Sequence, residues 1–497
     1  SCLKAAATAL GSRLHVSACD PHEARQQWDY DAGAGQIRLR NSSGGDATWC
    51  LDTPQPREDG GIVQVWACAE GSRSQQWYLG DADWVRPEQV LGVNETRSLP
   101  TACPSHFIAP PPPRHGTEHN GVALADTCFN WTGPERSNHV FVIGDWGGLI
   151  TRAGLQPADE RTVDFPGHRA FVAGADDSAQ IRVARQMRRR ALMSNPDYVI
   201  NVGDNFYWGG VGTSEDGSVY RGQGAKCGAS PPAVEFPTEQ WSKAFEEVYT
   251  GAGLDDKMWL GVLGNHDYGG WKFTAAWDQV IGYTWSSLRW MTPAQYWSTK
   301  VWYADFSVDY FFVDASFVDA QDPQSNPGHN ICSDLHNGPD ASCGESGPHN
   351  VSSCQGWFLD LWRRELKWLE ERLPRSTADW QIVVTHFPPT WVKEWEGIAE
   401  AHGIDLFISG HQHNQEVHYL AEAYLSGTAW IISGGGGGIT SEGLPSTDGY
   451  DDQYGFMDLT LYRDKIRIES VSHGGQVRNT TTIYPRHRKG AAAAEAS

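Results

Sequence analysis

The sequence lacks long apolar runs, closely spaced cysteine pairs and an excess of basic residues. No apolar stretch reaches the roughly 18 residues that a membrane-spanning helix needs, so we expect no membrane span. The ten cysteines form no Cys-x-x-Cys pair, which weakens a zinc-site or thioredoxin-type hypothesis and favours disulfides. Lys and Arg total 39 against 61 Asp and Glu, a formal charge of −22. A surface this acidic predicts no nucleic-acid-binding surface, and an anionic substrate would need local positive charge.

Asparagine is also scarce, yet a third of the asparagines begin glycosylation sequons. Five of only 15 Asn residues start an Asn-x-Ser/Thr triplet, where chance would give about one or two. With the even number of cysteines, they predict a secreted glycoprotein, found outside the cell, at its surface or in a vacuole. The chain starts at Ser1 without Met or an apolar signal, which is consistent with a processed, mature form. The sequons lie at Asn41, Asn94, Asn130, Asn350 and Asn479.

An internal repeat occupies residues 1–77. Both copies end in Gln-Gln-Trp, and each holds a cysteine pair about one short loop apart, suited to a disulfide between neighbouring strands. Stacked repeats of this size bury a core that neither copy could close alone. The pattern resembles the ricin-type lectin module, a β-trefoil of three such repeats, and no third Gln-x-Trp follows, so the resemblance implies an incomplete all-β trefoil over residues 1–99. The repeated residues are Cys2, Cys19 and Trp28 in the first copy and Cys50, Cys68 and Trp77 in the second.

The same resemblance implies sugar-binding residues only in the second repeat. Asp52 follows the first cysteine and Trp66 precedes the second, as in the lectin family, although Ser74 replaces the family Asn. A carboxylate can accept sugar hydroxyl protons while an aromatic face stacks on sugar C–H groups. Glycans are therefore a candidate partner of this region. The alternative is that the Gln-x-Trp motifs are core residues and that nothing binds.

The length predicts at least two domains, and apolar and charged fractions of 40% and 20% exclude wholesale disorder. Four successive prolines, Pro110 to Pro113, predict a stiff polyproline linker over residues 100–137. A catalytic domain is expected over residues 138–485. Residues 486–497, which contain four successive alanines, predict a disordered tail.

Five β-rich runs in the second half each lead into a cluster of Gly with Asp, Asn or His. Continuous apolar runs of this length are typical of strands buried on both faces, and helical patterns over residues 179–194 and 357–373 lie between some of them. The sequence therefore predicts a layered α/β domain with polar side chains at the carboxyl ends of its strands, where open α/β sheets bind ligands. The runs cover residues 140–143, 198–202, 259–263, 382–385 and 406–409.

These strand ends supply seven side chains that suit metal ions. A lone buried His or Asp is usually a satisfied core group, but five such strand ends in chain order are hard to explain in that way. Oxygen and imidazole donors without thiolate suit iron, zinc or manganese. Seven ligands are too many for one tetrahedral ion and about right for two ions that share a bridge. The candidates are Asp145, Asp204, Tyr207, Asn265, His386, His411 and His413.

The strand ends carry, in chain order, the motifs Gly-Asp-x-Gly, Gly-Asp-x-x-Tyr, Gly-Asn-His-Asp, Val-x-x-His and Gly-His-x-His. This ordered set is similar to that of the purple acid phosphatases, within the metallophosphoesterases. The resemblance implies a β-sandwich flanked by helices, a four-layer α/β/β/α fold. It also implies hydrolysis of a small phosphomonoester to phosphate and alcohol by a metal-bound hydroxide. Carried over motif by motif, the resemblance implies that Fe(III) would be held by Asp145, Tyr207 and His413. A divalent zinc, iron or manganese ion would be held by Asn265, His386 and His411. Asp204 would bridge the two ions.

Two substitutions within these motifs bear on the metal and on proton transfer. Most metallophosphoesterases have Asp-x-His in the first motif, but Gly147 takes the place of the His, and the phenolate of Tyr207 is a hard ligand that favours a trivalent ion. His266 is not a ligand in the family pattern, and it is expected to contact the phosphoryl group or protonate the leaving oxygen. Trp395 replaces a second substrate-side His of the mammalian-type enzymes, so leaving-group protonation would depend on His266.

Several alternatives remain open from the sequence. The same centre could cleave a phosphodiester or a nucleotide, and a remote alternative is a carbohydrate-binding protein with an inert phosphatase fold. The five glycines 434–438 lack the Lys and helix of a P-loop, and a backbone that passes close under the metal site is the favoured interpretation. Residues 317–356 read as a disulfide-stapled insertion that could wall the substrate pocket. Pairing stays open for Cys103, Cys128, Cys227, Cys332, Cys343 and Cys354.

Overall fold

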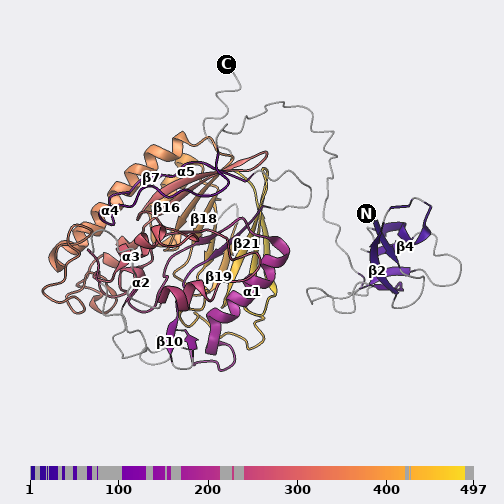
Figure 1. Cartoon of the computed structure of the whole chain (residues 1–497), viewed down its shortest axis with the longest axis horizontal. Coiled ribbons are helices and arrows are strands. Elements are labelled where there is room, and N and C mark those ends of the chain that lie inside the picture. The colour runs from indigo at the N-terminus through magenta and orange to yellow at the C-terminus, as the bar shows by residue number, and fades with distance from the viewer. Residues whose placement is uncertain are drawn as a thin grey trace, which may run out of the picture. The chain divides into compact units, whose positions relative to one another are not determined.

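The structure is a computed structural model that divides into two compact units, Ser1–Thr96 and Arg97–Ser497 (Figure 1). The described residues of the first unit are 2–5, 12–17, 19–20, 22–31, 36–39, 49–52, 64–69 and 75. Those of the second are 103–129, 138–151, 154–157, 169–212, 226–228, 240–419, 425 and 427–486.

The first unit contains a six-stranded antiparallel sheet in the order β1-β2-β6-β5-β4-β3, which confirms the predicted all-β region. Its second Gln-x-Trp motif contributes to the core, because the Gln75 side chain is buried and donates to Ala67 O at 2.8 Å. A disulfide joins Cys50 to Cys68, as predicted. Cys19 is also disulfide-bonded, whereas the side chain of Cys2 lies outside the described residues. The strands are β1 (Cys2–Ala5), β2 (Ser12–Ser17), β3 (Trp28–Asp31), β4 (Gln36–Leu39), β5 (Trp49–Asp52) and β6 (Gln64–Ala67).

Two large sheets form the second unit, and they share one apolar core. The seven-stranded sheet has the order β14-β13-β12-β9-β21-β22-β23, and the eight-stranded sheet has the order β19-β20-β18-β17-β16-β15-β7, with β8 also paired to β15. The first sheet consists of β9 (Asn138–Ile143), β12 (Tyr198–Asn201), β13 (Trp259–Gly261), β14 (Trp290–Met291), β21 (Gly455–Leu461), β22 (Ile466–Ser472) and β23 (Val477–Ile483). The second consists of β7 (Val122–Ala123), β8 (Thr127–Cys128), β15 (Trp297–Trp302), β16 (Ser307–Val313), β17 (Trp380–Thr385), β18 (Leu406–Ser409), β19 (Gln415–His418) and β20 (Ala429–Ser433).

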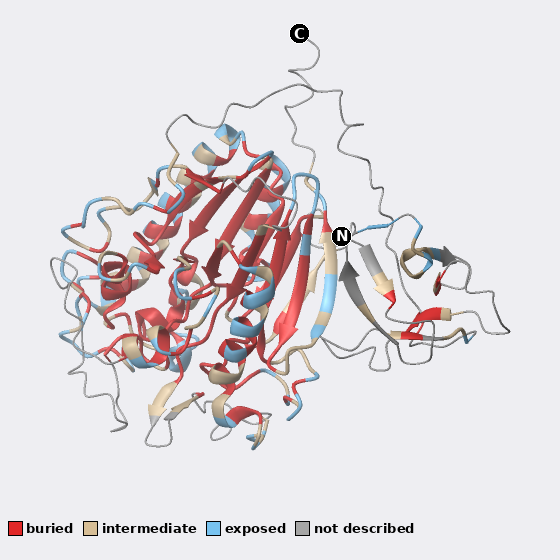
Figure 2. Cartoon of the chain, turned by 45° about the vertical axis from the view of Figure 1, so that its right-hand side comes forward, coloured by how far each residue is buried: buried red, intermediate tan, exposed pale blue. Residues whose placement is uncertain are grey.

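Alternating side chains along each strand build the layers. In β9, Val140 and Val142 face the core shared with the other sheet, while Phe141 and Ile143 belong to an outer core that includes residues of helix α1. This alternation follows from the two-residue period of a strand. The resulting order of helix, sheet, sheet and helix confirms the predicted four-layer fold, and both sheets appear as a buried centre in Figure 2. The helices are α1 (Ala179–Ser194), α2 (Asn265–Tyr268), α3 (Trp277–Gly282), α4 (Val351–Arg372) and α5 (Glu394–His402); a short hairpin pairs β10 (Leu149–Thr151) with β11 (Gly154–Gln156).

Helix α4 begins six residues before the predicted helix at 357–373. Asn350 caps it, since its side-chain oxygen accepts a hydrogen bond from the Ser353 N–H at 2.9 Å. A cap of this kind satisfies one of the free N–H groups of the first turn. The prediction began too late because the first turn, Val-Ser-Ser-Cys, lacks the apolar stripe that the rest of the helix buries.

The predicted linker over residues 100–137 is wrong for its described part. Phe107 is buried in the core between the sheets, and β7 and β8 both pair with β15. A disulfide joins Cys103 to Cys128, and Trp285 Nε1 donates to Pro110 O at 2.7 Å. The polyproline run is therefore held against the catalytic unit by an anchored aromatic ring, a disulfide and a hydrogen bond.

The catalytic unit also continues to the first residue of the predicted tail. The Arg486 N–H donates to Asp405 Oδ1 at 2.7 Å, and its guanidinium donates to Ala399 O at 3.0 Å. The prediction of disorder is therefore wrong at Arg486. Residues 487–497 lie outside the described part of the chain.

A pair of neighbouring substitutions tests whether residues 103–129 belong to the catalytic unit. Phe107→Ala should lower the free energy of unfolding by about 3–5 kcal/mol, because it leaves a cavity in the shared core. Ile108→Ala is the control, since its side chain is 46% exposed and its loss should change stability by less than about 0.5 kcal/mol. Chemical denaturation of the full chain measures both values. Equal, small effects would restore the linker interpretation.

Candidate metal centre

The predicted site residues follow parallel strands whose carboxyl ends meet. In the seven-stranded sheet β9, β12 and β13 are parallel neighbours, and in the other sheet β16, β17, β18 and β20 are parallel. Open α/β sheets bind ligands at this edge because the loops that follow the strands converge there. Asp145 lies just past β9, Asp204 past β12, Asn265 past β13, His386 directly after β17 and His411 past β18.

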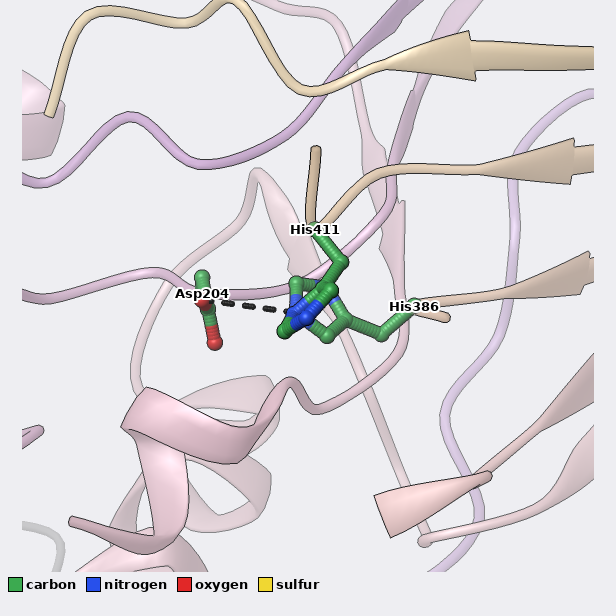
Figure 3. A group of neighbouring side chains, drawn as sticks. All are labelled: Asp204, His386 and His411. Carbon is green, nitrogen blue, oxygen red and sulfur yellow. Dashed lines mark hydrogen bonds and ion pairs between the residues drawn. The ribbon is translucent and has the colours of Figure 1, made fainter. Parts of the chain in front are cut away.

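Two groups of potential metal ligands form at this edge, and Asp204 belongs to both. One contains Asp204, His386 and His411, and the other contains Asp145, Asp204 and His413; within each group the ligand atoms lie within 4.8 Å of one another. Figure 3 shows the first group, in which the Asp204 carboxylate points toward the two imidazoles. His386 Nε2 is 3.3 Å from Asp204 Oδ2 and 3.2 Å from His411 Nδ1.

The remaining two predicted ligands join one group each. The Tyr207 hydroxyl donates to Asp145 Oδ1 at 3.0 Å and to Asp204 Oδ2 at 2.9 Å. Asn265 Oδ1 is 3.1 Å from His386 Nε2 and 3.2 Å from His411 Nδ1. All seven residues named from the sequence therefore come together, in two sets of four that share one carboxylate.

The chemistry of these donors fits two cations. Burial raises the pKa of Asp145 well above its usual range, and burial together with the carboxylates of Asp145 and Asp204 does the same to the pKa of Tyr207. Burial alone would lower the pKa of His386, but the carboxylates of Asp204 and Asp145 raise it to about 10. Buried acids this close together need compensating positive charge to ionise. Two metal ions would supply it.

Glycines give the backbone room to pass beside these carboxylates. A Cβ on Gly410 would lie 2.5 Å from Asp145 Oδ2, and one on Gly434 would lie 2.1 Å from Gln412 O. The glycine run 434–438 also packs on the first motif, where a Cβ on Gly436 would meet Gly144 O at 2.2 Å. The expected close passage of this run beneath the site is confirmed.

His266 lies beside the two groups, and its ring has a defined orientation. Its backbone N–H donates to Asp204 Oδ1 at 2.8 Å, and its Nδ1 is 2.5 Å from Trp208 O. Because a carbonyl can only accept, Nδ1 carries a proton and Nε2 is the atom that can exchange one with a ligand. Trp395, which stands where relatives have a second His, is fully buried and packs 5.4 Å from Trp362, ring centre to ring centre.

Two disulfides hold the insertion over residues 317–356. The disulfides are Cys227–Cys343 and Cys332–Cys354, a pairing that the sequence left open. The stapled segment brings the ring of His336 to 5.7 Å from that of Trp271, which stacks on Trp208 at 5.6 Å. A row of rings thus links the insertion to His266, whose ring lies 5.7 Å from Trp208.

Several supporting residues were missed by the sequence analysis. Val202 O accepts from His386 Nδ1 at 2.8 Å, and Glu442 Oε1 accepts from the His413 N–H at 3.2 Å. The Trp391 ring stands 4.8 Å from that of His411. A backbone carbonyl has no sequence signal, and Glu442 follows no spacing that marks it. Asp267 could have been found, because it ends the Gly-Asn-His-Asp motif and accepts from Asn205 Nδ2 at 2.9 Å.

The predicted sugar site is described only in part. Asp52 is 5% exposed and accepts a hydrogen bond from Gln64 Nε2 at 2.9 Å. Trp66 lies on β6, but its side chain is outside the described part of the chain. Sugar binding by these two residues stays a prediction. Among the described residues, no helix combines the length and apolar character needed to cross a membrane.

Comparison with known proteins gives two family matches and a set of distant relatives. The calcineurin-like phosphoesterase model matches residues 139–415, more than half of the chain, and the ricin-type β-trefoil lectin domain model matches residues 1–99. The tartrate-resistant acid phosphatase type 5 of Rattus norvegicus is 24% identical over 329 residues, which cover 63% of this chain and 77% of that protein. Purple acid phosphatase 4 of Arabidopsis thaliana is 27% identical over 357 residues, which cover 67% and 80%.

A purple acid phosphatase from seeds of yellow lupin, Lupinus luteus, aligns in three dimensions with 14% identity and a TM-score of 0.39, over 73% of this chain and 56% of its own. A likeness at that score adds nothing to the assignment. Relationship to the purple acid phosphatases implies a dinuclear metal centre, which agrees with two ligand groups that share Asp204. The chain belongs to the calcineurin-like phosphoesterase family, has purple acid phosphatases among its relatives, and carries a ricin-type lectin domain at its N-terminus.

Proposed function

We propose that this protein is an exported phosphomonoesterase of the purple acid phosphatase type, which converts a phosphate ester and water into phosphate and an alcohol. The observation that carries the proposal is the pair of ligand groups sharing Asp204, with a tyrosine hydroxyl in one of them. Curated relatives with acid phosphatase in their names support the reaction type. The disulfides of the described cysteines and the five sequons support export.

A ferric ion would be held by Asp145, Tyr207 and His413. A divalent ion would be held by Asn265, His386 and His411, and Asp204 would bridge the two ions. When bound, the metal pair would activate a water as nucleophile and neutralise charge on the phosphoryl oxygens. Tyr207 supports the choice of Fe(III). The raised pKa of its phenol disfavours loss of the proton, and a trivalent cation stabilises the phenolate more strongly than a divalent cation does.

The chain's own residues orient these donors. Val202 O fixes the His386 ring through Nδ1, so that Nε2 faces Asp204. The His266 N–H holds the other oxygen of Asp204, which keeps the shared carboxylate in one orientation.

Proton delivery to the leaving group is assigned to His266. Trp208 O holds its Nδ1, which leaves Nε2 free to give a proton to an alkoxide. Trp395 is buried among other rings, and its indole N–H is too weak an acid to protonate a leaving group, so no second imidazole takes over at that position.

The ferric assignment can be tested by colour. A phenolate bound to Fe(III) should give a violet or pink protein, and Tyr207→Phe should lose the visible band. Tyr268→Phe is the matched control, because Tyr268 is an equally buried phenol that hydrogen-bonds Asp314 and belongs to neither ligand group. Absorption spectra with metal analysis measure the outcome. A colourless, active wild-type protein with two zinc ions would contradict the ferric assignment and leave hydrolysis intact.

The shared carboxylate can be tested by metal content. Asp204→Asn should lower bound metal at both positions and reduce turnover by more than about 100-fold, since even outer-shell changes cost 10–100-fold. Asp145→Asn should affect one position, because Asp145 belongs to one ligand group only. The measurements are metal-to-protein ratio and steady-state kinetics. Near-native turnover with two bound metals in Asp204→Asn would show that the bridge is misassigned.

Leaving-group protonation can be tested with two substrates. His266→Asn should slow hydrolysis of an alkyl phosphate by roughly 10²–10⁴-fold and of an activated aryl phosphate by less, because an aryl oxide needs little protonation. Metal content should not change. Equal losses on both substrates would mean that His266 only contacts the phosphoryl oxygens. Faster cleavage of a bis-aryl phosphate than of an aryl phosphate by the wild type would overturn the monoesterase proposal itself.

A further inference from the structure

The two large sheets end on edge strands of very different length. Four of the edge strands are short, with two residues each in β7, β8 and β14 and four in β19. An edge strand presents unpaired backbone N–H and C=O groups that can pair with another chain, and very short edges limit that pairing. Among the described strands of these sheets, β23 is the exception, because it is an edge of seven residues.

The sequence of β23 offers little protection against pairing. Val-Arg-Asn-Thr-Thr-Thr-Ile contains no proline or lysine, and its β-branched residues favour extended backbone. Its one charged residue, Arg478, turns to the chain's own residues, with Nε 3.5 Å from Asp452 Oδ1 and the guanidinium 4.0 Å from the centre of the Tyr450 ring. A bulge opposite Ser470 and Val471 distorts one end only. In Figure 2 the edge of this sheet carries exposed segments.

A glycosylation sequon lies on this exposed strand. Asn479 is exposed, and the Thr481 hydroxyl donates to Asn479 Oδ1 at 2.8 Å, since residues two apart in a strand share a face. The hydrogen bond engages the carbonyl oxygen and leaves the amide nitrogen Nδ2 for modification. The Asn350 sequon shows the same arrangement, with the Ser352 hydroxyl 2.7 Å from Asn350 Oδ1, but it lies at the start of α4 and not on a sheet edge.

We propose that Asn479 carries an N-linked glycan and that this glycan shields the long edge of the seven-stranded sheet from pairing with a second copy of the chain. Nδ2 forms the bond to the anomeric carbon of an oligosaccharide carried on a lipid diphosphate. The anomeric C–O bond breaks, the lipid diphosphate leaves, and the proton lost from Nδ2 is taken up by a base. A bulky, hydrated oligosaccharide on an exposed strand keeps another strand from approaching its backbone. This role is independent of the phosphatase proposal.

The test compares two neighbouring threonines in the full-length protein, secreted from a glycosylating host. Thr481→Ala removes the sequon and keeps Asn479, whereas Thr480→Ala makes the same change on the same strand and keeps the sequon. Ser352→Ala removes the Asn350 sequon away from any sheet edge. We expect glycopeptide mass spectrometry to find the Asn479 glycan in the wild type and in Thr480→Ala. On warming, only Thr481→Ala should associate several-fold faster by light scattering, with phosphatase activity unchanged before association.

A second measurement separates shielding from a loss of stability. Trimming the glycans of the folded wild type with an endoglycosidase changes no residue, and it should accelerate association as Thr481→Ala does. An unmodified Asn479 in the secreted wild type would overturn the proposal. Association of Thr481→Ala at the rate of Thr480→Ala, or no effect of trimming, would overturn the shielding role.

Discussion

The close approach of two buried carboxylates, Asp145 and Asp204, is the constraint on which the site depends. Both are fully buried and lie at the ends of neighbouring parallel strands, where their charges repel one another in a poorly solvated setting. Each also has a positive φ, 57° and 51°, a backbone region that non-glycine residues seldom occupy. Strain of this kind persists only where the surrounding structure fixes it, and it concentrates at functional sites.

Neighbouring groups make this arrangement tolerable. The Tyr207 hydroxyl, the His266 N–H and the His411 N–H all donate to the two carboxylates. The glycines after β18 and β20 lack the side chains that would otherwise collide with Asp145, and Gly264 after β13 does the same for Asp204. The hydrogen bonds, the absent Cβ atoms and the converging strands thus serve one purpose, which is to hold negative charge where cations can bind.

The sequence predicted that these seven residues would come together because its signals are local. Each of the five motifs is a few residues long and directly follows an apolar run, and parallel strands carry such motifs to a common edge whatever the rest of the chain does. The segment around Phe107 was misread because its anchors are distant in sequence. Trp285 donates to Pro110 across 175 residues, and no local pattern reports a contact of that range. The local signal in this segment was the proline run, and it predicted a linker, whereas the segment packs against the catalytic unit.

The first unit shows a similar limit. The Gln-x-Trp repeat predicted an all-β region, and the hydrogen bonds of the buried Gln75 side chain explain why the motif recurs, since they tie it to Ala67 at the end of β6 and to Ala69. Asp52 is nearly buried, and that could not be read from its place after Cys50. The motifs therefore predicted that this unit is all-β, but they did not predict which of its side chains are exposed.

The interleaved disulfides of the insertion have a consequence for how the chain must mature. Cys343 is eleven residues from both Cys332 and Cys354, yet its partner is Cys227, 116 residues away. Closing the longer loop costs about 2 kcal/mol more in chain entropy, so in an unfolded chain the local mispairs form first. The native pattern requires that the fold bring Cys227 to Cys343 before the thiols are trapped, or that mispairs be reshuffled afterwards. Oxidation of this chain is thus a step that folding has to direct.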